Sequence, residues 1–316
     1  MLAGAVVACS MAARAQKPGR IYRVGGLFQG PWNAPHHVAL REELRRFGFI
    51  EGQNLFLDSD GHGVRPEQFA EHAVELVRSN VDAINCGGDA AIKSARQATT
   101  SIPILGLSDD MVGSGLVRSL AEPGGNITGV SILVSELDIK RQQLLLELFP
   151  ASRRIAALVD LNTTRPAQLK ALQDAAATRG IEVVLQQVLQ PNDIASAIDA
   201  IKAAGVSAVN VLATALFYNN RHIVLERIKT HRLPAIYQWP EFAQDGGLIA
   251  YGPSIVKIYR QQIAKLLAKL LRGARPADLP IEQPTEIDLV VNQRTAKSLG
   301  LTIPDSLLAR ADEVIE

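Results

Sequence analysis

Ser108 is the first residue of this chain whose setting suggests catalysis. A nucleophilic serine in a strand–turn–helix elbow requires a glycine two residues before it and another two residues after it. Gly106 meets the first requirement, but Asp110 occupies the second position. The chain also contains neither H-E-x-x-H nor C-x-x-C, so the usual zinc spacings are absent. We therefore predict no catalytic residue, no metal and no cofactor.

Two other motifs begin like binding sites for ions or nucleotides and are not completed. The run from Asp58 to Gly63 opens like a calcium loop, but Phe69 stands at its twelfth position, where a bidentate glutamate is needed. The glycines of the first apolar run lack the spacing of a dinucleotide-binding fingerprint. Gly87 and Gly88 precede Asp89 and could present backbone N–H groups to an anion, although glycine pairs after strands commonly form only tight turns.

Large aromatic residues collect where the predicted strands end. Aromatic residues make up only 5% of the chain, yet both tryptophans fall in such positions. In doubly wound sheets, ligands meet the loops at the carboxyl ends of the strands. Aromatic rings there can stack on a flat or apolar ligand, while polar neighbours fix its orientation. The aromatic residues in or beside these loops are Trp32, Phe217, Tyr218, Tyr237, Trp239 and Tyr251.

Several polar residues near these loops have a structural explanation beside the functional one. Asp109 and Asp110 could meet a ligand amine, and helix capping or solvation explains them equally well. His36 and His37 are expected to begin a helix rather than to bind a ligand. Cys86 ends an apolar run and is predicted to be a buried small hydrophobic residue.

Short apolar runs alternate with amphipathic segments, and this alternation must position the loops. In the first part of the chain, strands are predicted at 21–28, 55–58, 81–86 and 102–107, with helices at 36–47, 66–79 and 89–99. Farther on, strands are predicted at 155–159, 182–186, 209–212 and 235–237, with helices at 135–149, 166–179, 192–204 and 219–230. This rhythm predicts an α/β fold with two doubly wound lobes.

The stretch SLAEPGGNITGVS, residues 119–131, interrupts the rhythm. A helical run at 115–121 is predicted to stop at Pro123, and two glycines then precede a short strand at 127–130. We interpret this break as a crossover between the two lobes.

The tail is expected to return across the lobe boundary. A strand at 248–251 is followed by a long helix at 254–272, and a proline-punctuated extended segment at 275–291 suggests a further pass. Two lobes joined by several extended segments make a hinge with a ligand cleft. The predicted first lobe is 21–125 plus about 254–282, and the second is 126–253 plus about 283–316.

Composition and charge limit the functional classes. The 316 residues are 47% hydrophobic and 21% charged, which is typical of a globular protein long enough for two domains. The net charge of +1 and the lack of Lys/Arg runs argue against a nucleic-acid partner. Two cysteines are too few for a disulfide framework.

The N-terminal segment is typical of an exported protein. Leu2 to Ala13 is apolar and too short for a bilayer span, and it ends in an A-x-A cleavage pattern before Gln16. We predict a signal peptide at 1–15 and a periplasmic location. A competing interpretation places a lipid tether at Cys9 and ranks second, because it would leave only a very short hydrophobic region. A plain unstructured N-terminus is the remaining alternative.

Several long phrases resemble one protein family. They are SLAEPGGNITGVS, residues 232–254, residues 272–304 and the ending SLLARADEVIE. Together they resemble the substrate-binding proteins of ABC transporters, in the tryptophan-binding-like branch, from about Ile21 to Glu316. The resemblance implies a type I periplasmic-binding fold with two Rossmann-like lobes and three crossovers. It also implies a ligand enclosed between the lobes and a membrane permease that recognises the closed form.

One loop departs from the family pattern. The segment FQGPWNAPHH after the first strand is bulky and aromatic, where this branch often has small hydroxyl residues. This departure counts against an amino-acid ligand and favours an aromatic or otherwise apolar small molecule.

The leading hypothesis is an exported, monomeric solute-binding protein of an ABC importer, which captures a small organic molecule by lobe closure and does no chemistry on it. The residues predicted to bind the ligand are Gln29, Trp32, Asp89, Ser108, Asp109, Asn162, Thr214, Tyr237 and Trp239.

Three other classes of function were weighed against this one. A periplasmic ligand sensor for a membrane receptor is the main alternative. An effector domain of a transcription regulator is disfavoured because no helix-turn-helix precedes residue 21. An enzyme is disfavoured because no nucleophile, metal or cofactor motif is present.

Overall fold

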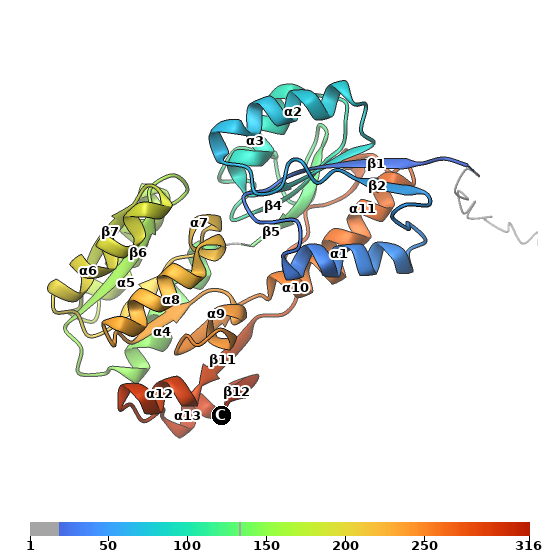
Figure 1. Ribbon diagram of the computed structural model, residues 1–316. Helices are drawn as coiled ribbons and strands as arrows, with labels where there is room; N and C mark the ends of the chain where they lie inside the picture. The colour runs from blue at the N-terminus through green and yellow to red at the C-terminus, as the bar shows by residue number, and fades with distance from the viewer. Residues whose placement is uncertain (1–18, 133) are drawn as a thin grey trace, which may run out of the picture.

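The computed structural model describes residues 19–132 and 134–316, which form two α/β lobes (Figure 1). The signal peptide predicted at 1–15, and with it Cys9, lies outside the described residues. No helix among the described residues has the length and apolar character that a membrane crossing requires.

The first lobe is built on a five-stranded parallel sheet in the order β2-β1-β3-β4-β5. Its strands are β1 (Tyr22–Leu27), β2 (Leu55–Leu57), β3 (Ala83–Gly87), β4 (Ile104–Ser108) and β5 (Ile127–Ser131). Its helices are α1 (Pro35–Arg46), α2 (Phe69–Arg78), which follows a 3₁₀ turn at Pro66–Gln68, and α3 (Asp89–Ala98). Helices α2 and α3 pack together on one face of this sheet, and α1 lies on the other (Figure 1). Strands covered on both faces are nearly continuous in apolar residues, as parallel sheets require.

The second lobe has a seven-stranded sheet in the order β12-β11-β10-β9-β8-β6-β7. Its strands are β6 (Arg154–Asp160), β7 (Glu182–Val188), β8 (Val209–Val211), β9 (Ala235–Tyr237), β10 (Ile249–Gly252), β11 (Asp288–Asn292) and β12 (Glu313–Ile315). Its larger helices are α4 (Val134–Leu148), α5 (Pro166–Ala177), α6 (Ile194–Ala203) and α8 (Arg221–Thr230). Shorter helices are α7 (Ala215–Asn219), α9 (Pro240–Gln244), α12 (Gln293–Leu299) and α13 (Asp305–Leu308), with a 3₁₀ turn at Pro191–Asp193.

A long helix returns from the second lobe to the first. It comprises α10 (Ile255–Ile258), a π-helical turn at Tyr259–Ile263 and α11 (Ala264–Leu271). All three parts pack against α1, on the face of the first sheet opposite α2 and α3. The apolar side of α11, with Leu267 fully buried, closes the hydrophobic core on that face.

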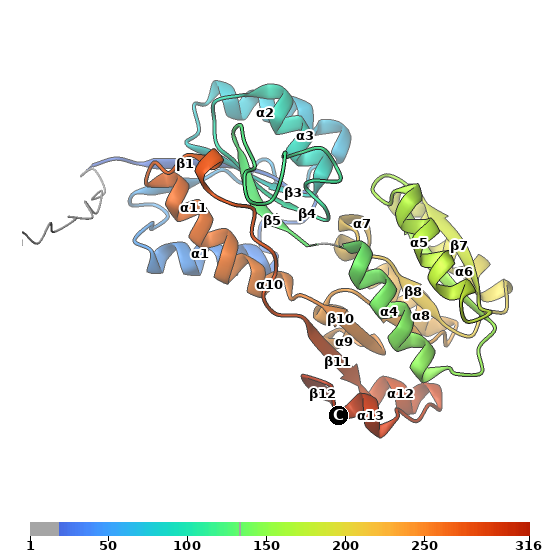
Figure 2. The same cartoon turned by 180° about the vertical axis from the view of Figure 1, so that it is seen from behind.

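The chain passes between the lobes three times. The passes follow β5, join β10 to α10, and lead from the 3₁₀ turn at Pro276–Asp278 to β11. Figure 2 shows the last pass running between the lobes beside the first. Their backbones are hydrogen-bonded: the Ser131 N–H donates to the Glu282 carbonyl at 2.9 Å, and the Glu282 N–H donates to the Gly129 carbonyl at 2.9 Å. Two of the three connections therefore form one paired hinge element.

The structure corrects the predicted lobe boundary between residues 125 and 126. Strand β5 pairs with β4 along its whole length, from Ile127 opposite Ile104 to Ser131 opposite Ser108. Residues 127–131 therefore belong to the first sheet, and the chain leaves the first lobe only after Ser131. The predicted strand at 127–130 is confirmed, but it ends the first lobe instead of beginning the second.

One other local prediction differs from the structure. Residues 115–121 form turns and bends, not a helix, because the chain folds back on Asp110, whose carboxylate accepts the Gly113 N–H at 2.8 Å. Strand β11 runs antiparallel to β10, because the chain leaves the second lobe after β10 and enters β11 on its return from the first lobe. After β11, α12 and α13 precede the final strand β12.

Candidate functional site

A cavity lies between the lobes, where the carboxyl ends of their strands face each other. The first lobe contributes the loops after β1, β3 and β4, the first turn of α1 and the start of the returning helix. The second lobe contributes the loop after β6, helix α7 and the loop after β9. The cavity thus occupies the position in which doubly wound sheets place ligands.

Five of the predicted ligand-binding residues line this cavity together. They are Gln29, Asp89, Ser108, Asp109 and Trp239. Four come from strand ends of the first lobe, and Trp239 comes from the second, where it precedes the first residue of α9. Their direct contact with a ligand stays a prediction.

The other four predicted residues lie elsewhere. Trp32 lines a smaller adjoining cavity, with the Arg41 guanidinium 4.5 Å from its ring centroid. Asn162 is exposed and donates to the Leu189 carbonyl at 2.8 Å, which ties down its own loop.

Thr214 and Tyr237 are buried within the second lobe. The Thr214 hydroxyl accepts the Phe217 N–H at 3.2 Å and so caps α7. Tyr237 stacks on Phe242, with ring centroids 4.8 Å apart, and it lines a groove on the outside of the lobe.

One end of the interlobe cavity is acidic. The Ser108 hydroxyl donates to one oxygen of Asp89 at 2.5 Å, and the Ser114 hydroxyl donates to the other. Asp109 follows Ser108 at the end of β4, and Thr163 of the second lobe faces the same region. A smaller cavity adjoins this end and shares Asp89, Asp109 and Thr163 with it.

The Asp109 carboxyl is placed among other carboxylates. Its pKa is raised well above the ordinary value, first because burial disfavours the charged form and then because of Asp89, Asp138 and Asp160. Arg141 acts in the opposite direction, but it is fully buried in an ion pair with Asp138. Among the residues described, Asp109 has no hydrogen-bonding side chain as a partner. This end of the cavity therefore favours a cationic group.

The aromatic end of the cavity is formed by rings from both lobes. The His36 ring lies 4.2 Å from the His37 ring, 4.8 Å from that of Tyr259 and 5.8 Å from that of Tyr218, measured between centroids. Tyr218 in turn meets Trp239 edge to face at 5.6 Å. Tyr259 begins the π-helical turn of the returning helix, and such turns commonly mark functional sites.

The histidines at the aromatic end are neutral. Burial, followed by the positive charge of Arg221, lowers the pKa of His36 to about 3. Burial, followed by His36, lowers the pKa of His37 to about 2. His62 stacks on Phe28 at 4.7 Å behind these rings, and its pKa is lowered to about 4, chiefly by burial. No cluster of metal-ligating side chains able to hold an ion is present within 19–132 and 134–316.

The two lobes touch around the cavity, so the described arrangement is closed. Asp110 of the first lobe forms an ion pair with Arg165 of the second at 2.6 Å, beside the acidic end. At the aromatic end, His36 and Tyr218 bring the two lobes together. An ion pair that spans the lobes exists only when the cleft is shut.

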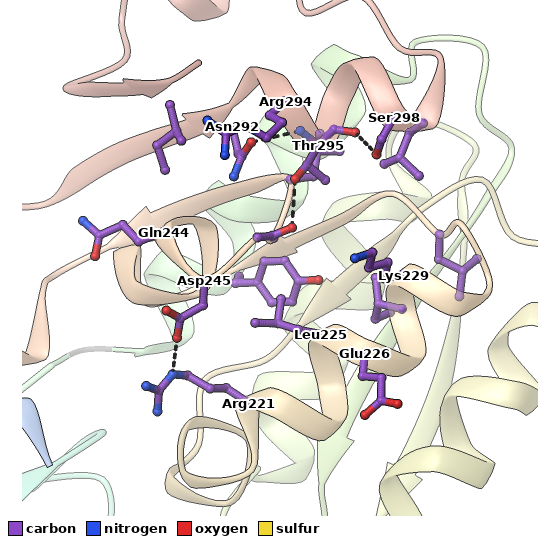
Figure 3. A pocket seen from close by; sticks show the side chains of 18 of the residues that line it. Arg221, Leu225, Glu226, Lys229, Gln244, Asp245, Asn292, Arg294, Thr295 and Ser298 are labelled. Carbon is purple, nitrogen blue, oxygen red and sulfur yellow. Dashed lines mark hydrogen bonds and ion pairs between the residues drawn. The ribbon is translucent and has the colours of Figure 1, made fainter. Parts of the chain in front are cut away.

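A larger groove, of about 1050 Å³, lies on the outside of the second lobe (Figure 3). It is bordered by α8, α9 and α12. Its polar groups largely satisfy one another: Arg221 pairs with Asp245 at 2.7 Å, and the Thr295 hydroxyl donates to the Gly246 carbonyl at 2.9 Å. This groove belongs to one lobe only, so lobe closure would not change it.

Several residues of the interlobe cavity were not among the predicted ligand contacts, and His36, His37, Tyr218 and Tyr259 at its aromatic end are among them. His36 and His37 do begin α1 as expected, and they also line the cavity. Their position directly after the first strand end was the available signal. Tyr259 comes from the returning helix, and no local pattern in the sequence indicates that it reaches this site.

The fold and the site define a bilobed ligand-binding protein. Two α/β lobes, three connecting passes and a cavity walled by both lobes are the features of the type I periplasmic binding proteins, and solved structures of that fold and of LacI-type regulators match the chain. Comparison of the sequence with family models gives a more specific answer: residues 36–315 match the model of the ABC transporter substrate binding proteins. The chain belongs to this family, whose members bind a substrate and are not enzymes.

Individual relatives agree with this assignment. The chain is 25% identical over 256 residues to the tyrosine-binding protein of Clostridioides difficile, covering 80% of this chain and 73% of that protein. A conserved domain protein from Vibrio cholerae is 26% identical, with a TM-score of 0.83 over 93% of this chain and 99% of that one. An ABC domain from Streptococcus pneumonia in complex with L-Trp is 24% identical, with a TM-score of 0.80 over 93% and 100%. The predicted family and fold are thus confirmed.

Proposed function

We propose that the chain binds an aromatic amino acid in the interlobe cavity and delivers it to the permease of an ABC importer. The observation that supports this most strongly is the division of the cavity into an acidic end and an aromatic end. An amino acid with a flat side chain carries both an ammonium group and a ring, one for each end of the cavity. Asp109 would receive the ammonium group, and the rings of Tyr218, Trp239 and Tyr259 would surround the side chain.

The ligand carboxylate has donors in the same cavity. Helix α3 begins at Asp89, and no side chain caps its first backbone N–H groups. The amino end of a helix favours negative charge. Gln29, which follows β1, also lines the cavity and carries a side-chain amide that can donate hydrogen bonds. Among the residues described, no lysine or arginine lines this cavity, so we propose that neutral donors hold the carboxylate.

The relatives support an aromatic amino acid over other small molecules. One is named for tyrosine, and the structure of another contains L-Trp. The sequence of the first loop argued against an amino acid because it is bulky and aromatic. The bulk of this loop is now explained differently, since Trp32 lies in the adjoining cavity and packs under Arg41. We therefore keep the predicted preference for an aromatic ligand and propose that this ligand is an amino acid.

We also propose that the mature protein acts as a monomer in the periplasm. The N-terminal pattern ending at Ala15 supports export. Ligand would stabilise the closed lobes by touching both, and the permease would recognise that closed form.

A thermal-shift screen of the mature chain, from Gln16 onward, tests the ligand class. L-tyrosine and L-tryptophan should raise the unfolding temperature, because a ligand at a hundredfold its Kd adds about 2.7 kcal/mol to the stability. The matched controls are their deaminated analogues, 4-hydroxyphenylpropionate and indole-3-propionate. We expect these acids to give a much smaller shift, since they lack the ammonium group for Asp109. Stabilisation only by aliphatic amino acids, or by none of the panel, would contradict the proposal.

A further inference from the structure

Three polar atoms at the aromatic end of the interlobe cavity have no hydrogen-bond partner among the described residues. They are Nδ1 of His36, Nε2 of His37 and Nε1 of Trp239. The three side chains are 4%, 2% and 5% exposed, and each lines the cavity. Buried polar groups in folded proteins are almost always hydrogen-bonded, so three such atoms around one cavity require an explanation.

These atoms can both donate and accept hydrogen bonds. The indole nitrogen of Trp239 is a donor only. His36 and His37 are neutral, and a neutral imidazole has one N–H donor and one acceptor nitrogen. Tyr218 lies between the histidine pair and Trp239, because its ring contacts both His36 and Trp239. A ligand group that fits here is therefore polar, uncharged and small.

The energetic consequence depends on the ring of the ligand. A hydrocarbon ring that excludes water from this end would leave the unpartnered atoms buried, and each of them would lose its hydration without gaining a hydrogen bond. A ring with a hydroxyl or an N–H group would satisfy at least one of them. Sites built to hydrogen-bond a polar ligand reject the analogue that lacks the polar group much more strongly than apolar pockets discriminate by size.

We infer that the aromatic end of this cavity selects amino acids whose ring carries a hydrogen-bonding group, a phenol or an indole, and rejects the plain phenyl ring. This selectivity rests on the proposed function. His36, His37 and Trp239 are its determinants, each through one buried polar atom.

Isothermal titration of the mature protein with L-tyrosine, L-tryptophan and L-phenylalanine tests the selectivity. The Kd for L-phenylalanine should be at least about tenfold higher than that for the better of the other two ligands, which corresponds to about 1.4 kcal/mol. Equal affinity for L-phenylalanine would overturn the inference and leave the proposed function intact. Failure of all three to bind would reject both.

Substitutions identify the determinants. His36→Phe and His37→Phe keep a ring and remove the hydrogen-bonding nitrogens, and Trp239→Phe removes the indole N–H. In each variant, the Kd for L-phenylalanine divided by the Kd for the better polar-ring ligand should be at least about threefold smaller than in wild type, which corresponds to about 0.65 kcal/mol. His62→Phe is the matched control, because His62 belongs to the same group of rings but does not line the cavity. An unchanged ratio in all three variants, or an equal change in the control, would overturn the assignment.

Discussion

Two adjacent aspartates at the end of β4 have opposite electrostatic settings. The pKa of Asp109 is raised by burial and by neighbouring carboxylates. For Asp110, burial acts in the same direction, but the Gly113 N–H and Arg165 outweigh it and lower the pKa. Asp109 is therefore costly to ionise in the closed arrangement without a ligand, whereas Asp110 is stabilised in its ionised form there. The difference makes the two residues a natural pair for experiments.

Replacing Asp109 by asparagine should stabilise the ligand-free protein at neutral and higher pH. Because the folded-state pKa lies above the unfolded value, the folded protein holds a proton that the unfolded chain releases, and stability falls as the pH rises through this interval. The asparagine variant avoids this loss. Urea denaturation should give a higher free energy of unfolding for D109N than for wild type at pH 8, with the difference vanishing near pH 4. A less stable D109N at pH 8 would contradict the assigned environment.

The Asp110→Asn variant should behave in the opposite way. Its folded-state pKa is lowered, so its contribution to stability is present above the ordinary carboxyl pKa and is lost as the pH falls through the lowered value. The ion pair with Arg165 is partly exposed, so the cost of D110N at pH 7 should not exceed about 1 kcal/mol. Denaturation of both variants in one pH series checks the contrast in sign.

Ligand binding should draw a proton from Asp109. An ammonium group favours the ionised carboxylate, so affinity for an aromatic amino acid should increase as the pH rises through the raised pKa of the free protein. Calorimetry in two buffers of different ionisation enthalpy should detect proton release for wild type and none for D109N. The substitution should also weaken binding by about 2 kcal/mol or more, because it removes one partner of a buried charge pair. A pH-independent affinity in wild type would exclude Asp109 as the ammonium site.

At the level of elements, the close approach of β5 to β4 explains why the PGGNITG segment ends in a glycine. Gly129 of β5 lies opposite Gly106 of β4, with φ at +150°, and a Cβ atom at Gly129 would come within 1.9 Å of the Gly106 carbonyl oxygen. The next residues, Val130 and Ser131, pair with the third pass at Glu282. Glycine at 129 therefore allows the last strand of the first lobe to enter the hinge.

Substituting Gly129 by alanine should strongly destabilise the protein. Strain and overpacking together should cost about 3 kcal/mol or more. Gly124→Ala is the matched control: φ there is +71°, and the nearest atom to an added Cβ is 3.9 Å away, so the cost should be about 1–2 kcal/mol. Equal decreases in the free energy of unfolding for G129A and G124A in urea denaturation would show that the contact with the Gly106 backbone does not add to the cost.

The ion pair between Asp110 and Arg165 joins the loop after β4 to the start of α5, across the cleft. It forms only in the closed arrangement, so it should favour closure before and after ligand binds. Arg165→Gln should lower ligand affinity by no more than about fivefold, the scale of a partly exposed pair. Lys170→Gln breaks a pair with Asp174 inside α5 and should leave affinity unchanged. Equal affinities for R165Q and wild type would show that this ion pair does not contribute to closure.

The sequence was a good guide to elements and a partial guide to the site. Prolines and glycines bounded most helices, and apolar runs located the strands, because both reflect local backbone chemistry. Asp89, Ser108 and Asp109 were found because β3 and β4 are parallel neighbours whose ends must meet. Tyr237 does not line the cavity in this structure, because its ring stacks on Phe242 in the lobe interior, and side-chain direction at the end of a three-residue strand has no sequence signal. Its contact with a ligand stays a prediction.

On the scale of the whole molecule, the cavity exists only because the two lobes meet. Tyr259 reaches it through a helix that begins more than 120 residues after β5, since the returning helix packs on α1 of the first lobe. Such long-range assembly cannot be deduced from periodicity, which explains why this residue was missed. We therefore propose that ligand binding by this family member depends on closure of the two lobes.

Small-angle X-ray scattering of the mature protein, with and without a saturating aromatic amino acid, tests closure most directly. The proposed mechanism predicts a smaller radius of gyration with ligand, and a ligand-bound curve that matches the closed arrangement with Asp110 against Arg165. An identical curve in both samples, while calorimetry shows that the ligand is bound, would contradict binding by lobe closure.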